Sequence, residues 1–177
     1  MQMWKQTLWW QMRTIIKTIE LEPIILEVDP AGQEIISYRG KAAIDDDGSM
    51  NIWHDPCWQP ETSLKQDGKD IDAEKVPYIA VPPAILHGCK GIVLGCLCMV
   101  INTLKSSTCL GVTAEIGPHE KLGEMSPEMA RRLGLNPSAT SGGTAAHIIK
   151  YVLWPGKPAV VDGITYQLQP APKKQNG

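Results

Sequence analysis

Two glutamates lie nine residues apart in the second half of the chain, Glu115 at the end of an apolar stretch and Glu124 directly before Met-Ser-Pro. The segment between them, IGPHEKLG, contains two glycines and one proline, so we expect the backbone to turn and return. Two carboxylates across one cleft can cleave a glycosidic bond, because one protonates the leaving oxygen and the other activates water or attacks the sugar. The alternative is that both glutamates lie on the solvated surface, where most glutamates are found.

Further acidic and aromatic residues precede this pair. Asp45 and Asp47 are alternate residues at the end of a predicted strand, so they should share one face and bind the ammonium groups of a cationic substrate. A turn cap or a calcium loop is the alternative, although the later ligands of an EF-hand are missing. The faces of indole rings can stack on sugar rings and bind cations. The alternative is that one of the two tryptophans is packed in the hydrophobic core. The predicted substrate-binding cluster consists of Trp53, His54, Asp55 and Trp58.

The charge is distributed unevenly along the chain. Residues 42–128 carry six basic and thirteen acidic groups, a net of −7, whereas residues 129–177 carry six basic groups and one acidic group. The acidic block favours a cationic polymer, a cationic small molecule or a metal as partner, and it disfavours nucleic acid. The basic C-terminal part contains no nucleic-acid recognition motif.

Several motifs occur in a characteristic order. AIDDDGS is followed by VPYIAVPPAIL, by GPHEKLGEMSPEMARRLG, and then by SGGT and YVLWPG. Over about residues 40–157 this order resembles the glycoside hydrolase family 75 chitosanases and their bacterial and phage relatives. The Gly-Glu-x-Ser core, in which Glu124 lies, is the most specific part of the resemblance.

The resemblance implies an endo-acting, metal-independent chitosanase without a cofactor, whose partner is chitosan. By position, Glu124 matches the catalytic glutamate, and Glu115 matches a catalytic acid that is usually Asp. Our hypothesis is an inverting mechanism with Glu124 as general acid and Glu115 as general base, their carboxyl groups roughly 6.5–9.5 Å apart. Lys121 matches the family's lysine and can pair with one carboxylate, which holds it ionised. The substitution at Glu115 leaves a catalytically silent carbohydrate-binding module as one alternative, and a phage-type lysis enzyme acting on deacetylated peptidoglycan is another.

The elements that must position these residues are mostly strands. The pattern predicts a β-dominated α+β domain, either a compact barrel or two packed sheets, with one or two short helices. SPEMARRLG is the clearest helix, because Ser126 suits the N-cap and Gly134 stops it. VPYIAVPPAIL predicts a strand with prolines at its ends, hence an edge-like or bulged one. Cys96 and Cys98 lie in an apolar stretch typical of a buried strand and have no metal spacing.

The predicted organisation is an N-terminal amphipathic arm over residues 1–22, a catalytic domain over 23–168 and a flexible tail over 169–177. Apolar residues at helical spacing predict a helix in the arm, either packed on the domain or acting at a membrane surface or in oligomerisation. These residues are Trp4, Leu8, Met12, Ile15, Ile16 and Ile19. No membrane span and no signal peptide are evident, so we expect action on an extracellular polymer after release or lysis.

Overall fold

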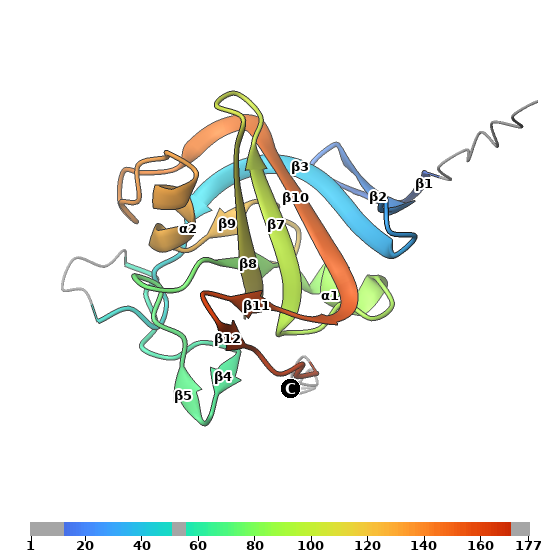
Figure 1. Ribbon diagram of the computed structural model, residues 1–177. Coiled ribbons are helices and arrows are strands. Elements are labelled where there is room, and N and C mark those ends of the chain that lie inside the picture. The colour runs from blue at the N-terminus through green and yellow to red at the C-terminus, as the bar shows by residue number, and fades with distance from the viewer. Residues whose placement is uncertain (1–12, 51–55, 171–177) are drawn as a thin grey trace, which may run out of the picture.

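The computed structural model describes residues 13–50 and 56–170. Strands dominate it, and six of them close into a barrel beside two short helices (Figure 1). The barrel order is β3, β10, β7, β8, β6 and β9, and β9 pairs with β3 to complete it. The barrel strands are β3 (Glu34–Ile44), β6 (Tyr78–Val81), β7 (Cys96–Asn102), β8 (Ser107–Ile116), β9 (Glu124–Met125) and β10 (Thr144–Pro158). The predicted β-dominated fold is confirmed, and of the two expected architectures the protein adopts the barrel.

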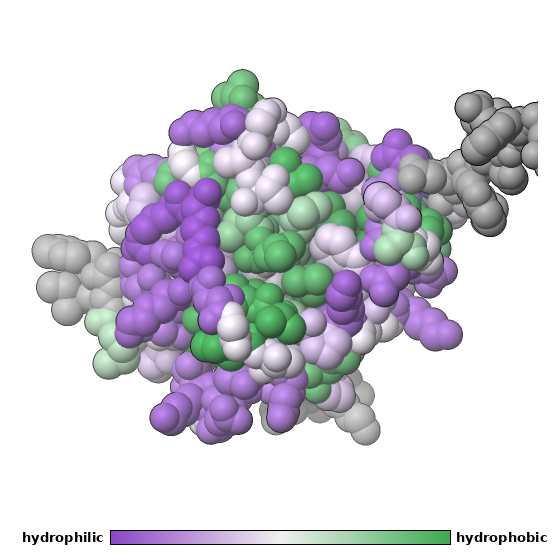
Figure 2. Space-filling model, in the orientation of Figure 1, coloured by the Kyte–Doolittle hydropathy of each residue, from purple (hydrophilic) through white to green (hydrophobic). Residues whose placement is uncertain are grey.

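Four of these strands, β3, β10, β7 and β8, form an antiparallel run. In β7 the buried residues Cys96, Cys98 and Val100 alternate with half-buried outward residues such as Met99, as a strand with one face on the core requires. An apolar patch with more hydrophilic surroundings lies at the centre of the face shown in Figure 2, in the region that β7 crosses in Figure 1. The strand predicted around Cys96 and Cys98 is therefore confirmed.

Two parallel contacts close the barrel, β3 with β9 and β6 with β8. The prediction of an edge-like β6 is wrong, because β6 lies between β8 and β9 inside the closed sheet. The prediction of a bulge is right, since the register shifts between Ile79 and Ala80. Pro77 and Pro82 lie just outside the strand, so every residue within it keeps the N–H that a central strand needs.

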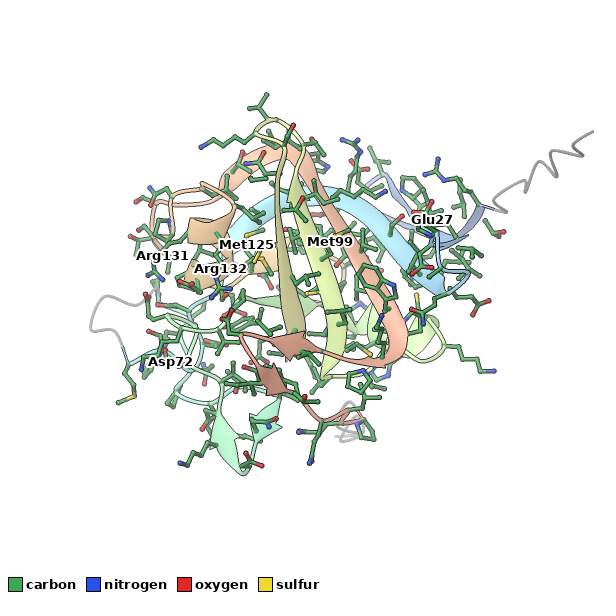
Figure 3. The ribbon with its side chains drawn as sticks, viewed as in Figure 1. Glu27, Asp72, Met99, Met125, Arg131 and Arg132 are labelled. Carbon is green, nitrogen blue, oxygen red and sulfur yellow. The ribbon has the colours of Figure 1, made fainter. Side chains whose placement is uncertain are left out.

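Helix α2 (Pro127–Arg132) follows β9 directly and forms as predicted. The Ser126 side chain accepts a hydrogen bond from the N–H of Met129, and Gly134 has a φ of +71°. Figure 3 shows Arg131 and Arg132 side by side on this helix. Arg131 forms an ion pair with Glu74, and Arg132 forms one of 2.6 Å with Asp162. These pairs tie the helix, and with it the end of β9, to the segment before β6 and to the turn at Asp162.

The prediction of a strand through VPYIAVPPAIL is wrong for its last part, because Pro83–Gly88 form helix α1. Its sequence continues the apolar run of β6, but Pro83 occupies the first helical position, where no N–H is needed. Within the part of the chain that the structure describes, no helix is long and apolar enough to cross a membrane.

The prediction of an N-terminal helix is wrong for the residues that the structure describes. Residues 14–19 form β1 (Thr14–Ile19), which pairs with β2 (Glu22–Val28), and β2 in turn adds to β3. Pairing with a neighbouring strand decides the conformation here and overrides the helical spacing of the isoleucines. Trp4, Leu8 and Met12 lie outside the described residues. Two small hairpins, β4–β5 (Lys65–Gln66, Lys69–Asp70) and β11–β12 (Val160–Val161, Ile164–Thr165), complete the fold.

Candidate active site

One residue of β6 links the two glutamates. Ala80 is the register partner of Glu115 on β8 and also of Glu124 on β9. Ala43 of β3 is the partner of Glu124 on its other side. Residues in register across neighbouring strands point to the same face of a sheet, so Glu115 and Glu124 lie in one row with a single alanine between them. Two strand spacings of about 4.8 Å place their backbones roughly 10 Å apart.

The two glutamates open into the same cavity, which has a volume of about 280 Å³. Asp45 and Asp47 line it as well, whereas Asp46 between them is buried and lies against a different hollow beside α2. The predicted sharing of one face by Asp45 and Asp47 is therefore present in the structure. The cavity is lined by Ile44, Asp45, Asp47, Cys57, Glu115, Ile116, Gly117, Pro118 and Glu124.

The carboxylate of Glu115 is buried, with 6% of the residue exposed, and it accepts three hydrogen bonds. The N–H of Ser63 donates to Oε2 at 2.9 Å, the hydroxyl of Ser63 donates to Oε1, and the N–H of Ile116 donates to Oε1 at 2.9 Å. Burial raises the pKa of Glu115 above its ordinary value, while these donors act in the opposite direction by favouring the ionised form. Ser63 was not among the predicted site residues, because a serine in a polar loop 52 positions away carries no sequence signal for this contact.

Glu124 is half-buried at the start of β9. Its carboxylate lies over Gly117, where a Cβ would come within 2.7 Å of Glu124 Oε2 and 3.6 Å of the Ala80 Cβ. Small residues at positions 117 and 80 thus leave the space that the Glu124 carboxylate occupies. Gly117 belongs to the connecting segment, where the sequence predicts only a turn, and it also leaves room for the Glu124 carboxylate.

Asp45 is held near both glutamates by the barrel itself. Its N–H donates to the carbonyl of Met125, and its Oδ1 accepts from the N–H of Asp47 at 3.1 Å. Tyr78, which is fully buried on β6, donates its hydroxyl to the backbone carbonyls of Asp45 and Asp47 at 3.1 and 3.0 Å. Burial, followed by repulsion from Asp47, Glu115 and Glu124, raises the pKa of Asp45 to about 8. Asp45 is therefore mostly protonated at neutral pH.

The other predicted site residues lie in different surroundings. Trp53, His54 and Asp55 lie outside the described residues. Trp58 is half-buried and does not line the cavity, whereas its neighbour Cys57 is exposed and does. Lys121 is exposed on the connecting segment, and over residues 13–50 and 56–170 it forms no ion pair with a carboxylate. The expected pairing of Lys121 with Glu115 or Glu124 is absent because its side chain extends into solvent.

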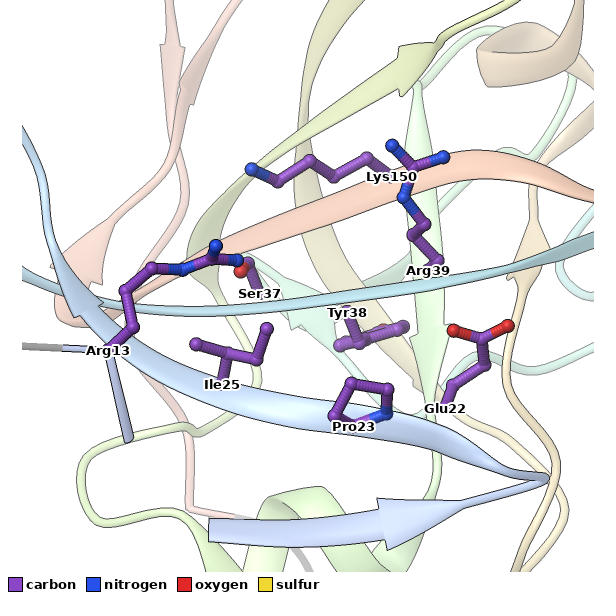
Figure 4. Close-up of a pocket in the computed structure, with 8 residues that line it drawn as sticks. All are labelled: Arg13, Glu22, Pro23, Ile25, Ser37, Tyr38, Arg39 and Lys150. Carbon is purple, nitrogen blue, oxygen red and sulfur yellow. The ribbon is translucent and has the colours of Figure 1, made fainter. Parts of the chain in front are cut away.

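A second hollow of about 200 Å³ lies over β2 and β3, and Figure 4 shows its lining. Its basic residues include Arg13, Arg39 and Lys150. Two of them face the buried carboxylate of Glu27, with Arg13 at 3.1 Å and Lys150 at 3.7 Å. The acidic cavity differs because carboxylates outnumber cations in its lining.

The acidic cavity has the groups needed for acid–base hydrolysis: a buried carboxylate with fixed donors, a second carboxylate in the same row and a protonated neighbour. Within the described ranges, no group of three or more His, Cys, Asp and Glu side chains is arranged to hold a metal ion. Comparison of the sequence with protein-family models finds no match, and comparison with curated proteins finds no significant one.

Proposed function

We propose that this protein is an endo-acting glycoside hydrolase that cleaves the β-1,4 linkages of chitosan. One observation carries the proposal: Glu115 and Glu124 share Ala80 as their register partner and line one acidic cavity. Two strand spacings put their backbones roughly 10 Å apart, from which the two side chains can reach the roughly 6.5–9.5 Å between carboxyl groups that inverting hydrolases use. The resemblance of the GPHEKLGEMS segment to family 75 chitosanases supports the same assignment.

In the proposed reaction Glu124 is the general acid and Glu115 the general base. The ionised Glu115 takes a proton from water as the water oxygen bonds to the anomeric carbon. The bond from that carbon to the leaving oxygen breaks, and Glu124 gives its proton to this oxygen. Exchange with solvent then restores both carboxyl groups. The donors on Glu115 favour the ionised state that a base requires.

The acidic lining supports a cationic substrate. Chitosan carries ammonium groups, and the field of Asp47, Glu115 and Glu124 around one cavity attracts them. Asp45 contributes a neutral carboxyl at pH 7 that can donate a hydrogen bond or give up its proton when an ammonium group arrives. A neutral polymer such as chitin gains nothing from this field.

The binding-only alternative is favoured by one observation, the burial of Glu115 beneath three protein donors. Reducing-end release from chitosan separates the two, measured for wild type, Glu115→Gln and Glu124→Gln beside binding to the same polymer. For the hydrolase we expect turnover in wild type and a loss of at least about a hundredfold in each variant. Binding without turnover in wild type would favour the module, and release from partly deacetylated peptidoglycan but not chitosan would favour a lysis enzyme.

A further inference from the structure

Glu115 is buried yet held in a specific orientation, and one residue provides two of its three hydrogen bonds. We propose that Ser63 is the positioning residue of this site, holding Glu115 so that Oε2 is the oxygen that accepts a proton from the attacking water. This inference rests on the proposed function for the role of the water, and on the hydrogen bonds alone for the orientation of Glu115.

The two oxygens of Glu115 are used unequally. Oε1 accepts from the Ser63 hydroxyl and from the N–H of Ile116, while Oε2 accepts only from the N–H of Ser63 at 2.9 Å. A carboxylate oxygen has two acceptor sites. Both sites of Oε1 are therefore taken by the protein, and Oε2 keeps one for a water molecule or for a substrate group.

Ser63 can act in this way because the residues on both sides of it are fixed. Leu64 is fully buried, and its N–H donates at 2.9 Å to the carbonyl of Ala114, the residue before Glu115. The N–H of Thr62 donates to Asp70 Oδ1 at 2.7 Å, and its hydroxyl donates to the carbonyl of Leu64 at 2.7 Å. Ser63 is thus held in register with the end of β8, and its donors are in place before any substrate binds.

A second serine-to-glutamate hydrogen bond elsewhere in the protein serves as a control, because its loss tests for a general effect on stability without touching Glu115. The hydroxyl of Ser37 donates at 2.7 Å to Glu27 Oε1, a second buried serine-to-glutamate hydrogen bond. Glu27 lies on the outer face of β2 beside Arg13 and outside the acidic cavity. Ser37→Ala therefore removes the same chemical contact at a distant carboxylate.

The experiment compares wild type, Ser63→Ala, Ser63→Thr and Ser37→Ala by two readouts. The first is the titration midpoint of Glu115, followed through its carboxyl carbon resonance and assigned by its absence in Glu115→Gln. The second is the pH profile of kcat/KM on chitosan. Removing the hydroxyl donor disfavours the ionised form, so in Ser63→Ala we expect the midpoint and the acidic limb of the profile to move up by roughly one pH unit. Ser63→Thr keeps the hydroxyl and should restore both, and Ser37→Ala should move neither.

An unchanged Glu115 midpoint in Ser63→Ala would overturn the proposal, as would an equal shift of the profile in Ser37→Ala. If wild type released no reducing ends while the midpoint still moved, the hydrolase assignment and the role of the water would be overturned, and the orientation of Glu115 by Ser63 would stand. If Ser63→Ala did not fold, a Ser63→Thr protein with a displaced midpoint would count against the proposal.

Discussion

The carboxylate of Glu124 occupies the space that a side chain at Gly117 would need. A Cβ at position 117 would lie 2.7 Å from Glu124 Oε2, which is closer than non-bonded atoms of this kind approach. The glycine follows Glu115 by two residues and the two glutamates lie in one row, so the contact couples the positions of both halves of the candidate site.

Gly117→Ala should displace the Glu124 carboxylate without removing any titratable group. Because a displacement near 1 Å can lower a rate by about a hundredfold, we expect kcat on chitosan to fall by about 10- to 100-fold while the thermal unfolding temperature changes little. Gly88→Ala is the matched control, since a Cβ there meets nothing within 4 Å. Full activity in Gly117→Ala would show that the position of Glu124 is unimportant.

Asp45→Asn should stabilise the protein in a pH-dependent way. The pKa of Asp45 is about 8 in the folded protein against an ordinary value of 3.8, so between these values the folded state binds more protons than the unfolded state. Its stability therefore falls as the pH rises from about 4 to about 8. Asparagine keeps the acceptor for the N–H of Asp47, and because it does not ionise it removes this pH-dependent loss of stability.

We expect Asp45→Asn and wild type to unfold at similar urea concentrations near pH 4. By pH 8 the unfolding free energy of the variant should exceed that of wild type by about 2 kcal/mol or more. Asp67→Asn is the control, because Asp67 is an exposed turn residue with a φ of +51°, a conformation that asparagine also tolerates. A stability difference between Asp45→Asn and wild type that does not vary with pH would contradict the protonated state of Asp45.

Replacing two buried tyrosines by phenylalanine should change the stability of the protein in different ways. Tyr78 donates to the carbonyls of Asp45 and Asp47, so Tyr78→Phe leaves buried acceptors without their donor and should cost about 1–2 kcal/mol of unfolding free energy. It should also raise KM for chitosan, because the two aspartates lose their anchor. The hydroxyl of Tyr38 has no hydrogen-bond partner among the described residues, so Tyr38→Phe should be neutral or stabilising. Equal losses of stability in the two variants would argue against the anchoring of the aspartates by Tyr78.

Cys57 offers a direct probe of access to the cavity. It is exposed at the lining of the acidic cavity, and the remaining cysteines are buried. A bulky thiol reagent should label one cysteine in the native protein, lower turnover by roughly tenfold or more by obstructing the cavity, and react more slowly when chitosan oligomers are bound. In Cys57→Ser the same treatment should leave the activity of that variant unchanged. Labelling that neither slows with oligomer nor affects turnover would place substrate elsewhere. The remaining cysteines are Cys89, Cys96, Cys98 and Cys109.

The local elements of the fold could be predicted, but their pairing could not. Alternation in β7 and the cap at Ser126 act within a few residues, so their sequence signals are direct. The parallel contacts of β6 with β8 and of β9 with β3 join segments far apart in the chain, and nothing in the spacing of VPYIAVPPAIL distinguishes a central strand from an edge. The same limit explains the N-terminal error, since pairing with β2 decides the conformation of residues 14–19.

The candidate site shows the same division. The alternation of Asp45 and Asp47 and the turn between Glu115 and Glu124 were evident from local patterns, and the structure brings all four side chains to one cavity. Ser63, Tyr78 and Gly117 were missed because their parts depend on tertiary contacts with Glu115, the aspartates and Glu124. Lys121 matched a family position, yet the barrel leaves it exposed.

The stereochemistry of cleavage tests the central claim most directly, because it depends both on hydrolysis and on the spacing of the two glutamates. The measurement is a proton NMR time course of the anomeric signals while wild-type protein hydrolyses a chitosan oligomer. With Glu115 and Glu124 two strands apart and water between the base and the sugar, we expect the α-anomer to accumulate first, followed by mutarotation to the equilibrium mixture. First release of the β-anomer, or no cleavage of the oligomer at all, would contradict the assignment of these two residues as the acid and base of an inverting chitosanase.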